Sequence, residues 1–349
     1  MEGYVSLSSN RHIVRDRVAR HPLVTFFVVT CIISWLAFWL TYQFDLGVVN
    51  GFGIVGSVGP ALAAMIVSAL LTPERSAAPA RRRWWLFAAI AILTLAMLTV
   101  RRLWITPEWL TVAGQVTTTV AYPTFAAFVV DVLAAGVVAF ILSGVRSPVL
   151  GVQDLLHSLR PLRLHVRWYW WVIALALYPA VIVLGNVISS VLRLQEALPR
   201  APDLSFLLVM DVLLTSLYIL VGGGGLEEPG WRGFALPQLQ KRFSPVGSSL
   251  IVGVLWTFWH WPLFWLDPLM GGPLTVFSFA LTVIPLAFLF TAMFNATGGS
   301  LPVAILLHTS INVTPIFLPA SSLGAGLWLL LAVGTALWLW RRHTHHAPT

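Results

Sequence analysis

The sequence has very little charge. Aspartate, glutamate, lysine and arginine make up only 10% of its 349 residues, against about 25% in ordinary soluble domains. Hydrophobic residues make up 58%, and several apolar runs reach the roughly 20 residues that a helix needs to cross a bilayer. This composition excludes a soluble globular protein. It predicts an all-α fold, a polytopic transmembrane bundle of about 8–10 spans, because helices satisfy their backbone hydrogen bonds within lipid.

Cysteine and lysine are nearly absent. The single cysteine, Cys31, lies inside an apolar run, which excludes a disulfide framework and a cysteine metal site. Lysine occurs once against 20 arginines, a bias that points to a GC-rich bacterial genome. The net charge of +8 comes from short basic clusters between the apolar runs, and clusters of this kind set the orientation of a membrane protein. We therefore predict no nucleic-acid partner.

Ten apolar runs are the expected spans. They are 23–43, 51–72, 84–100, 119–145, 168–192, 205–222, 246–261, 275–296, 301–318 and 322–340. Placing both termini in the cytoplasm puts 17 of the 21 lysines and arginines on that side, as the positive-inside rule requires. The sequence thus predicts a multi-pass protein of the cell membrane, in a bacterium the inner membrane, with both termini cytoplasmic.

One stretch, 222–262, places ionisable side chains among apolar ones. Glu227 and Glu228 are adjacent, Arg232 follows, and His260 lies far along an apolar run. Ionisable groups at membrane depth are costly and usually mark a function. A later apolar run adds His308 and, one helical turn on, Asn312.

The local sequence predicts where the first of these residues lie. Four glycines, Gly222–Gly225, and the pair Pro229-Gly230 should break the long segment in two. Glu227 and Glu228 would then lie at a helix start, near its positive dipole end. Glu227 and His260 are equally far from the polar turn at 242–245, so an antiparallel pair of segments would bring them to similar depth.

Each polar residue also has a structural interpretation. Glu228 and Arg232 are spaced i, i+4 and are predicted to form a structural ion pair. That pairing leaves Glu227 as the general base. A lone histidine in a membrane helix is often only a hydrogen-bonded core residue. The convergence of two histidines, an asparagine and these charges within lipid favours a functional site.

The spacing of these residues resembles that of a known family, the CPBP intramembrane proteases. The resemblance rests on three motifs, Glu227-Glu228-x-x-x-Arg232, Trp256-x-x-x-His260 and His308-x-x-x-Asn312. The family includes type II CAAX prenyl endopeptidases and bacteriocin-processing or Abi-like immunity proteins. Residue 256 is a departure, since the second motif of the family commonly has phenylalanine there.

The resemblance implies an intramembrane endopeptidase that hydrolyses a peptide bond of a membrane-associated protein or peptide. Glu227 and His260 would activate water, while His308 and Asn312 assist at the carbonyl oxygen. Glu228, Arg232 and Trp256 would support them. We favour a metal-free glutamate mechanism. The alternative is zinc bound by Glu227, His260 and His308, a His₂Glu set.

The expected partners are membrane lipids and a membrane-associated substrate, and two other functions stay open. A transporter could use the buried charges as an ion path, although no inverted repeat is visible. A non-catalytic scaffold or immunity protein would keep the fold without the chemistry.

Five segments follow from this interpretation. They are a cytoplasmic N-terminal segment (1–22), N-terminal transmembrane helices (23–145), an amphipathic interfacial connector (146–167), a catalytic transmembrane core (168–340) that carries motifs at 227–232, 256–260 and 308–312, and a cytoplasmic tail (341–349). The connector is assigned to the interface because Val152, Leu155, Leu156 and Leu159 fall on one helical face.

Overall fold

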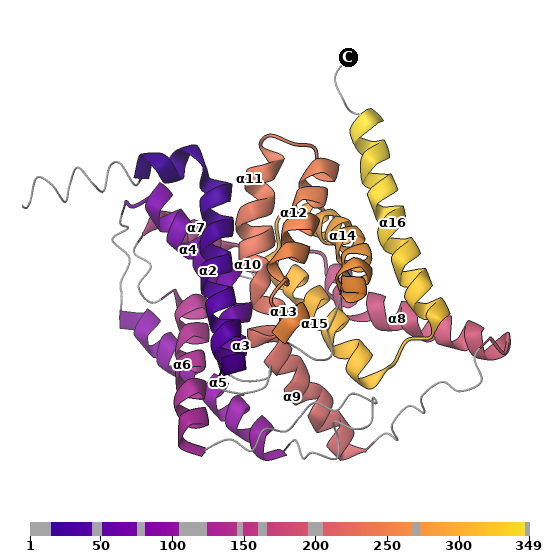
Figure 1. Cartoon of the computed structure of the whole chain (residues 1–349), viewed down its shortest axis with the longest axis horizontal. Helices are drawn as coiled ribbons and strands as arrows, with labels where there is room; N and C mark the ends of the chain where they lie inside the picture. Colours follow the sequence, from indigo (N-terminus) through magenta and orange to yellow (C-terminus); the bar gives the residue numbers. More distant parts are fainter. Residues whose placement is uncertain are drawn as a thin grey trace, which may run out of the picture.

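A computed structural model describes most of the chain (Figure 1). The described residues are 15–43, 51–74, 81–104, 124–144, 149–159, 166–194, 205–266 and 273–345. These ranges contain no β-strand, which confirms the predicted all-α fold class. Most of the predicted N-terminal segment, Arg160 and Arg163 of the connector, and the last four residues of the tail lie outside them.

The helices follow the predicted apolar runs closely. In chain order they are α2 (Pro22–Gln43), α3 (Gly51–Ser57), α4 (Gly59–Leu71), α5 (Arg81–Trp104), α6 (Thr124–Ser143), α7 (Leu150–His157), α8 (Tyr169–Val191), α9 (Phe206–Gly222), α10 (Glu228–Gly230), α11 (Leu236–Gln240), α12 (Pro245–Trp259), α13 (Leu263–Leu266), α14 (Pro273–Ala296), α15 (Leu301–Phe317) and α16 (Ser322–His345). The second expected span is interrupted, since α3 and α4 are separate helices.

The bundle has the dimensions and surface of a membrane protein. Within the described residues, six helical stretches are long and apolar enough to cross a bilayer, and four shorter apolar helices pack among them. Large hydrophobic side chains cover the outside, with Val24, Leu93 and Leu330 all more than 60% exposed. An apolar exterior of this extent, on helices long enough to cross a bilayer, is typical of a protein embedded in lipid.

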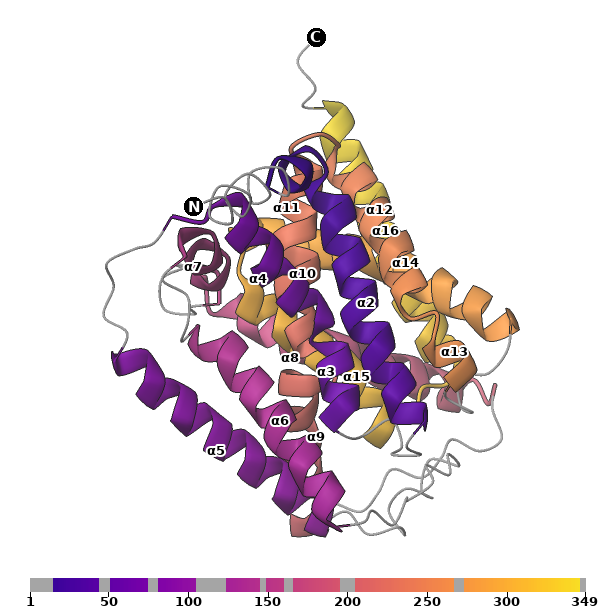
Figure 2. The ribbon, with the colours of Figure 1, turned by 60° about the vertical axis from the view of Figure 1, so that its left-hand side comes forward.

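Two groups of helices enclose the broken segment between α9 and α11 (Figure 2). On one side α2 packs along α3 and α4, and α6 joins them through α3. On the other side α12 pairs with α14, while α15 and α16 both pack on α8. The aromatic rings of Phe26 and Phe38 in α2 contact Trp231 and Trp259, respectively. The broken segment is therefore held inside the bundle and away from lipid.

Part of the predicted connector, Leu150–His157, forms helix α7. Val152 and Leu155 are buried, and α7 packs on α4. The fit is tight, because a Cβ on Gly151 would lie 2.2 Å from the backbone oxygen of Ser68. The backbone oxygen of Ser158 accepts a hydrogen bond from the amide of Leu301, so the connector also fixes the start of α15.

The first and last described helices place the two ends of the described chain at the same end of the bundle. The start of α2, the end of α16 and the turn between α11 and α12 lie at one end of the bundle in both views, and the start of α9 lies at the opposite end (Figures 1 and 2). This arrangement fits an even number of crossings between α2 and α16.

Candidate active site

The segment between α9 and α11 is broken where glycine and proline predicted. Helix α9 ends at Gly222, and Gly224 has φ +127°, a conformation that favours glycine. A 3₁₀ turn (Gly225–Glu227), the single turn α10 and a π-helical turn (Trp231–Ala235) then lead into α11. Irregular turns of this kind are frequent at functional sites.

A residue that precedes proline usually avoids helical backbone angles. Glu228 precedes Pro229 and is nevertheless helical. Glu228 has φ −61° and ψ −35°. It is the first residue of α10, and Pro229 is the second. Proline is tolerated in a first helical turn, because the missing N–H has no partner there. The prediction that both glutamates lie at a helix start is confirmed.

Glu227 is held by the second motif. Its Oε2 accepts a 2.8 Å hydrogen bond from the indole Nε1 of Trp256, and both residues are buried. Trp256 lies in α12, one helical turn before His260, which caps that helix. Glu227 therefore contacts the end of α12 near His260, as predicted. The contact depends on the indole N–H, and phenylalanine at this position would have no donor.

Glu228 joins the first motif to the third. Its Oε1 accepts hydrogen bonds from Nη1 of Arg232 at 3.0 Å and from Nδ1 of His308 at 2.6 Å. Glu228 and Arg232 are both fully buried and His308 is 4% exposed. The predicted Glu228–Arg232 ion pair is present, and Glu228 has a second partner that the sequence did not reveal.

Aromatic rings surround the arginine. The guanidinium carbon of Arg232 lies 4.5 Å from the ring centroid of Trp256 and 4.0 Å from that of Phe290. A cation that is removed from water is stabilised by such ring faces. Trp256 therefore contacts both a carboxylate and a cation of the site, and its ring also meets His308 edge to face at 5.4 Å.

His260 caps the C-terminal end of α12. Its Nδ1 lies 2.8 Å from the backbone oxygen of Trp256, and since a carbonyl can only accept, Nδ1 carries the proton. In the neutral imidazole, the other ring nitrogen, Nε2, is then the acceptor. The ring is packed against Trp259 at 4.6 Å and Phe279 at 4.7 Å, and it is partly exposed while most of the site is buried.

Asn312 and His308 both face the glycine turn. Nδ2 of Asn312 donates to the backbone oxygen of Gly223 at 2.9 Å. A Cβ on Gly224 would lie 2.6 Å from Nε2 of His308 and 2.7 Å from Nδ2 of Asn312. Glycine is thus required here for its backbone conformation and for close approach to both side chains.

The predicted residues converge, but they do not form a metal site. His308 is close enough to Glu227 and to His260 to interact electrostatically with each. Among the residues that the structure describes, no three His, Cys, Asp or Glu side chains are placed to hold a metal ion. The alternative zinc set of Glu227, His260 and His308 does not fit this geometry.

The part of the chain that carries the site is similar to a known protein family. Residues 209–314 match the sequence profile of the family described as type II CAAX prenyl endopeptidase Rce1-like. This range contains all three motifs. Residues 209–314 are therefore similar to this family, in agreement with the resemblance that the three motifs indicated. The matched range runs from α9 through α15 and includes the broken turn that positions both glutamates.

A curated relative supports the assignment. The protein named CAAX prenyl protease 2 from Methanococcus maripaludis is 30% identical over 105 residues. That alignment covers 28% of this chain and 38% of the relative, so the chain spans well under half of the relative's length.

Proposed function

We propose that the chain is an intramembrane endopeptidase, with Glu227, His260, His308 and Asn312 as its catalytic residues. The observation that carries this proposal is the convergence of Glu227, His260 and His308 around Trp256, inside the matched range 209–314. The name of the relative and the family description support peptide hydrolysis as the reaction.

In the first step, water attacks the carbonyl carbon of the scissile peptide bond. Oε1 of Glu227 takes the proton from the water, while Trp256 holds Oε2. His260 helps to orient the water through Nε2, because its Nδ1 is committed to the backbone of α12. A new C–O bond forms and the carbonyl oxygen becomes an oxyanion.

His308 and Asn312 serve the oxyanion in this proposal. Glu228 accepts from Nδ1 of His308, which stabilises a protonated imidazole whose Nε2–H can donate to the oxyanion.

In the second step the intermediate collapses. The C–N bond breaks, and the proton that Glu227 took from water passes to the amine of the leaving peptide. The carboxylate of Glu227 is restored, and the two products are a new carboxyl terminus and a new amino terminus. No group beyond the four catalytic residues and water is needed for the balance.

The substrate in this proposal is a membrane-associated protein or peptide, and the enzyme lies in the cell membrane with both termini in the cytoplasm. The basic clusters support this orientation, since 16 of the 21 lysines and arginines then lie on the cytoplasmic side. Arg232 is not counted, because it is buried in the site.

The test is cleavage by the full chain in proteoliposomes. Peptide libraries with and without a C-terminal prenyl cysteine are offered to the wild type, to Glu227→Gln and to Glu74→Gln. Glu74→Gln is the control, because it makes the same change at an exposed glutamate that is distant in sequence from the site. We expect the wild type and Glu74→Gln to cleave and Glu227→Gln to be inactive but folded. Equal cleavage by Glu227→Gln would contradict the proposed base, and a folded wild type that cleaves nothing would favour a scaffold.

A further inference from the structure

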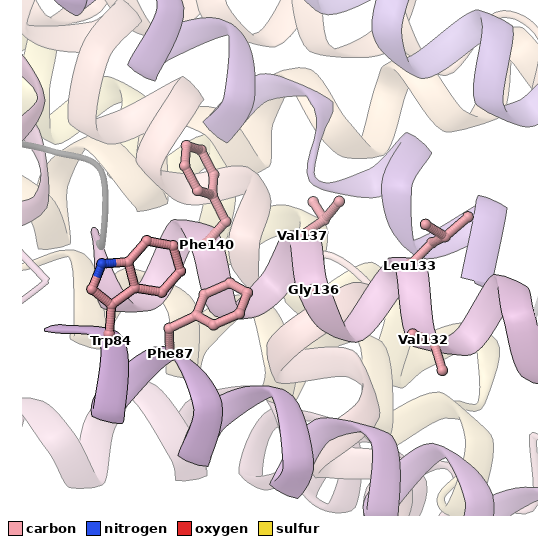
Figure 3. A pocket seen from close by; sticks show the side chains of 7 residues that line it. All are labelled: Trp84, Phe87, Val132, Leu133, Gly136, Val137 and Phe140. Carbon is pink, nitrogen blue, oxygen red and sulfur yellow. The ribbon is translucent and has the colours of Figure 1, made fainter.

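A shallow cavity of about 480 Å³ lies between α5 and α6, apart from the proposed active site (Figure 3). Its lining consists entirely of apolar residues, Trp84 and Phe87 from α5 and Val132, Leu133, Gly136, Val137 and Phe140 from α6. This volume falls within the range of about 300–1,000 Å³ that small-molecule sites occupy.

The missing side chain of Gly136 opens the cavity. A Cβ built on Gly136 would meet no atom within 4 Å, and in Figure 3 this residue lies between the side chains of Phe140 and Leu133. A larger residue would fit the backbone and would fill the cavity instead of colliding with a neighbour. The cavity therefore depends on glycine at position 136.

The cavity faces lipid. Only 11% of the α5 span is buried inside the protein, and α5 packs chiefly on α6. Lipid tails are as apolar as the lining, so no hydrophobic force closes a groove of this kind. An acyl chain can fill it, and the groups at the end of the cavity decide which lipid supplies the chain.

One end of the cavity is basic and aromatic. Helix α5 begins with three arginines, Arg81–Arg83, directly before Trp84 of the lining. Nη1 of Arg83 donates to the backbone oxygen of Gly144 at 3.1 Å, which joins the start of α5 to the end of α6. Trp85, which follows Trp84 in α5, is 72% exposed. Tryptophan and arginine at a helix end mark the level of the lipid headgroups.

We propose that this groove binds one acyl chain of an anionic phospholipid, with its phosphate headgroup at the N-terminal end of α5, beside Arg83. Charge complementarity selects the occupant, because basic pockets between transmembrane helices bind anionic headgroups. A zwitterionic lipid presents the same chain to the groove but gains less at the arginines.

The experiment measures lipid retention by the full chain in detergent, by native mass spectrometry after exchange into dioleoyl phosphatidylglycerol or dioleoyl phosphatidylcholine. We expect the wild type to retain phosphatidylglycerol about tenfold better than phosphatidylcholine. Gly136→Leu fills the groove and should lose that lipid about tenfold. Gly334→Leu is the matched control, because a Cβ at this exposed glycine of α16 also meets no atom within 4 Å.

A further variant tests the headgroup. Arg83→Gln keeps a donor for the oxygen of Gly144 but removes the charge, and it should reduce the preference for phosphatidylglycerol about fivefold. Retention by Gly136→Leu equal to that of the wild type would overturn the groove as the site. Equal retention of both lipids by the wild type would overturn the anionic headgroup. Displacement of phosphatidylglycerol by a farnesylated peptide, one for one, would make the groove a substrate site instead. All of these results are independent of peptidase activity.

Discussion

The indole N–H of Trp256 donates a 2.8 Å hydrogen bond to Oε2 of Glu227, inside a buried cluster. The same side chain lies against the guanidinium of Arg232 and the ring of His308. A carboxylate that accepts a fixed hydrogen bond on one oxygen presents the other in a defined direction. Residue 256 thus links all three motifs, and tryptophan supplies a contact that phenylalanine cannot make.

Trp256→Phe should reduce kcat about tenfold and leave KM nearly unchanged, because a hydrogen bond to a charged group contributes about 1.5–3 kcal/mol. The variant keeps an aromatic ring for Arg232 and His308, so the fold should persist. The measurement is steady-state cleavage in proteoliposomes together with the thermal midpoint.

The control for this substitution is Trp265→Phe, which makes the same change at a side chain that is 61% exposed. It should leave both constants unchanged. A loss in Trp256→Phe that appears only as a lower thermal midpoint would show that Trp256 packs the site and does not orient Glu227.

Arg232→Ala should destabilise the protein as well as abolish cleavage. The substitution removes a fully buried cation from Glu228 and from two aromatic rings, and breaking one side of a buried ion pair costs about 3–5 kcal/mol. The measurement is the amount of folded protein extracted from membranes and its thermal midpoint. Arg167→Ala, at an exposed arginine, should change neither. Normal folding of Arg232→Ala with cleavage alone lost would give Arg232 a direct part in the reaction.

Local sequence rules predicted the parts of this site that lie close together in the chain. The break at Gly222–Gly225 follows from glycine and proline chemistry, and the Glu228–Arg232 pair follows from its i, i+4 spacing. The apolar runs predicted the helices because lipid imposes a length on each one.

Contacts across long stretches of sequence could not be predicted in the same way. Glu228 and His308 are separated by 80 positions, and their hydrogen bond depends on how α15 packs beside α10. The spacing placed Asn312 one helical turn from His308. In the structure, Nδ1 of His308 donates to Glu228, and the amide of Asn312 donates to the glycine turn. The donor of Trp256 was visible in the sequence as a departure from phenylalanine, but its acceptor was not.

Gly224→Ala should abolish cleavage more completely than it destabilises the fold. The backbone at φ +127° disfavours a side chain, at a cost of about 1–3 kcal/mol. The added methyl would also displace Nε2 of His308 and the amide of Asn312. Cleavage and thermal midpoint are measured beside Gly326→Ala, where a Cβ meets no atom within 4 Å. Retained cleavage in Gly224→Ala would exclude a role for this turn in placing His308.

The last prediction concerns orientation in the membrane. In a Cys31→Ser background, cysteine is introduced at Lys241, an exposed residue of the turn after α11, or at Phe206, which is 72% exposed at the start of α9. The turn after α11 and the start of α9 lie at opposite ends of the bundle (Figure 1). With cytoplasmic termini, a membrane-impermeant thiol reagent should label Lys241→Cys only in inverted vesicles and Phe206→Cys only in right-side-out vesicles. The Cys31→Ser parent should not react in either preparation. The reverse pattern would place the termini and the basic turn outside the cytoplasm, and it would move the expected products of cleavage to the other compartment.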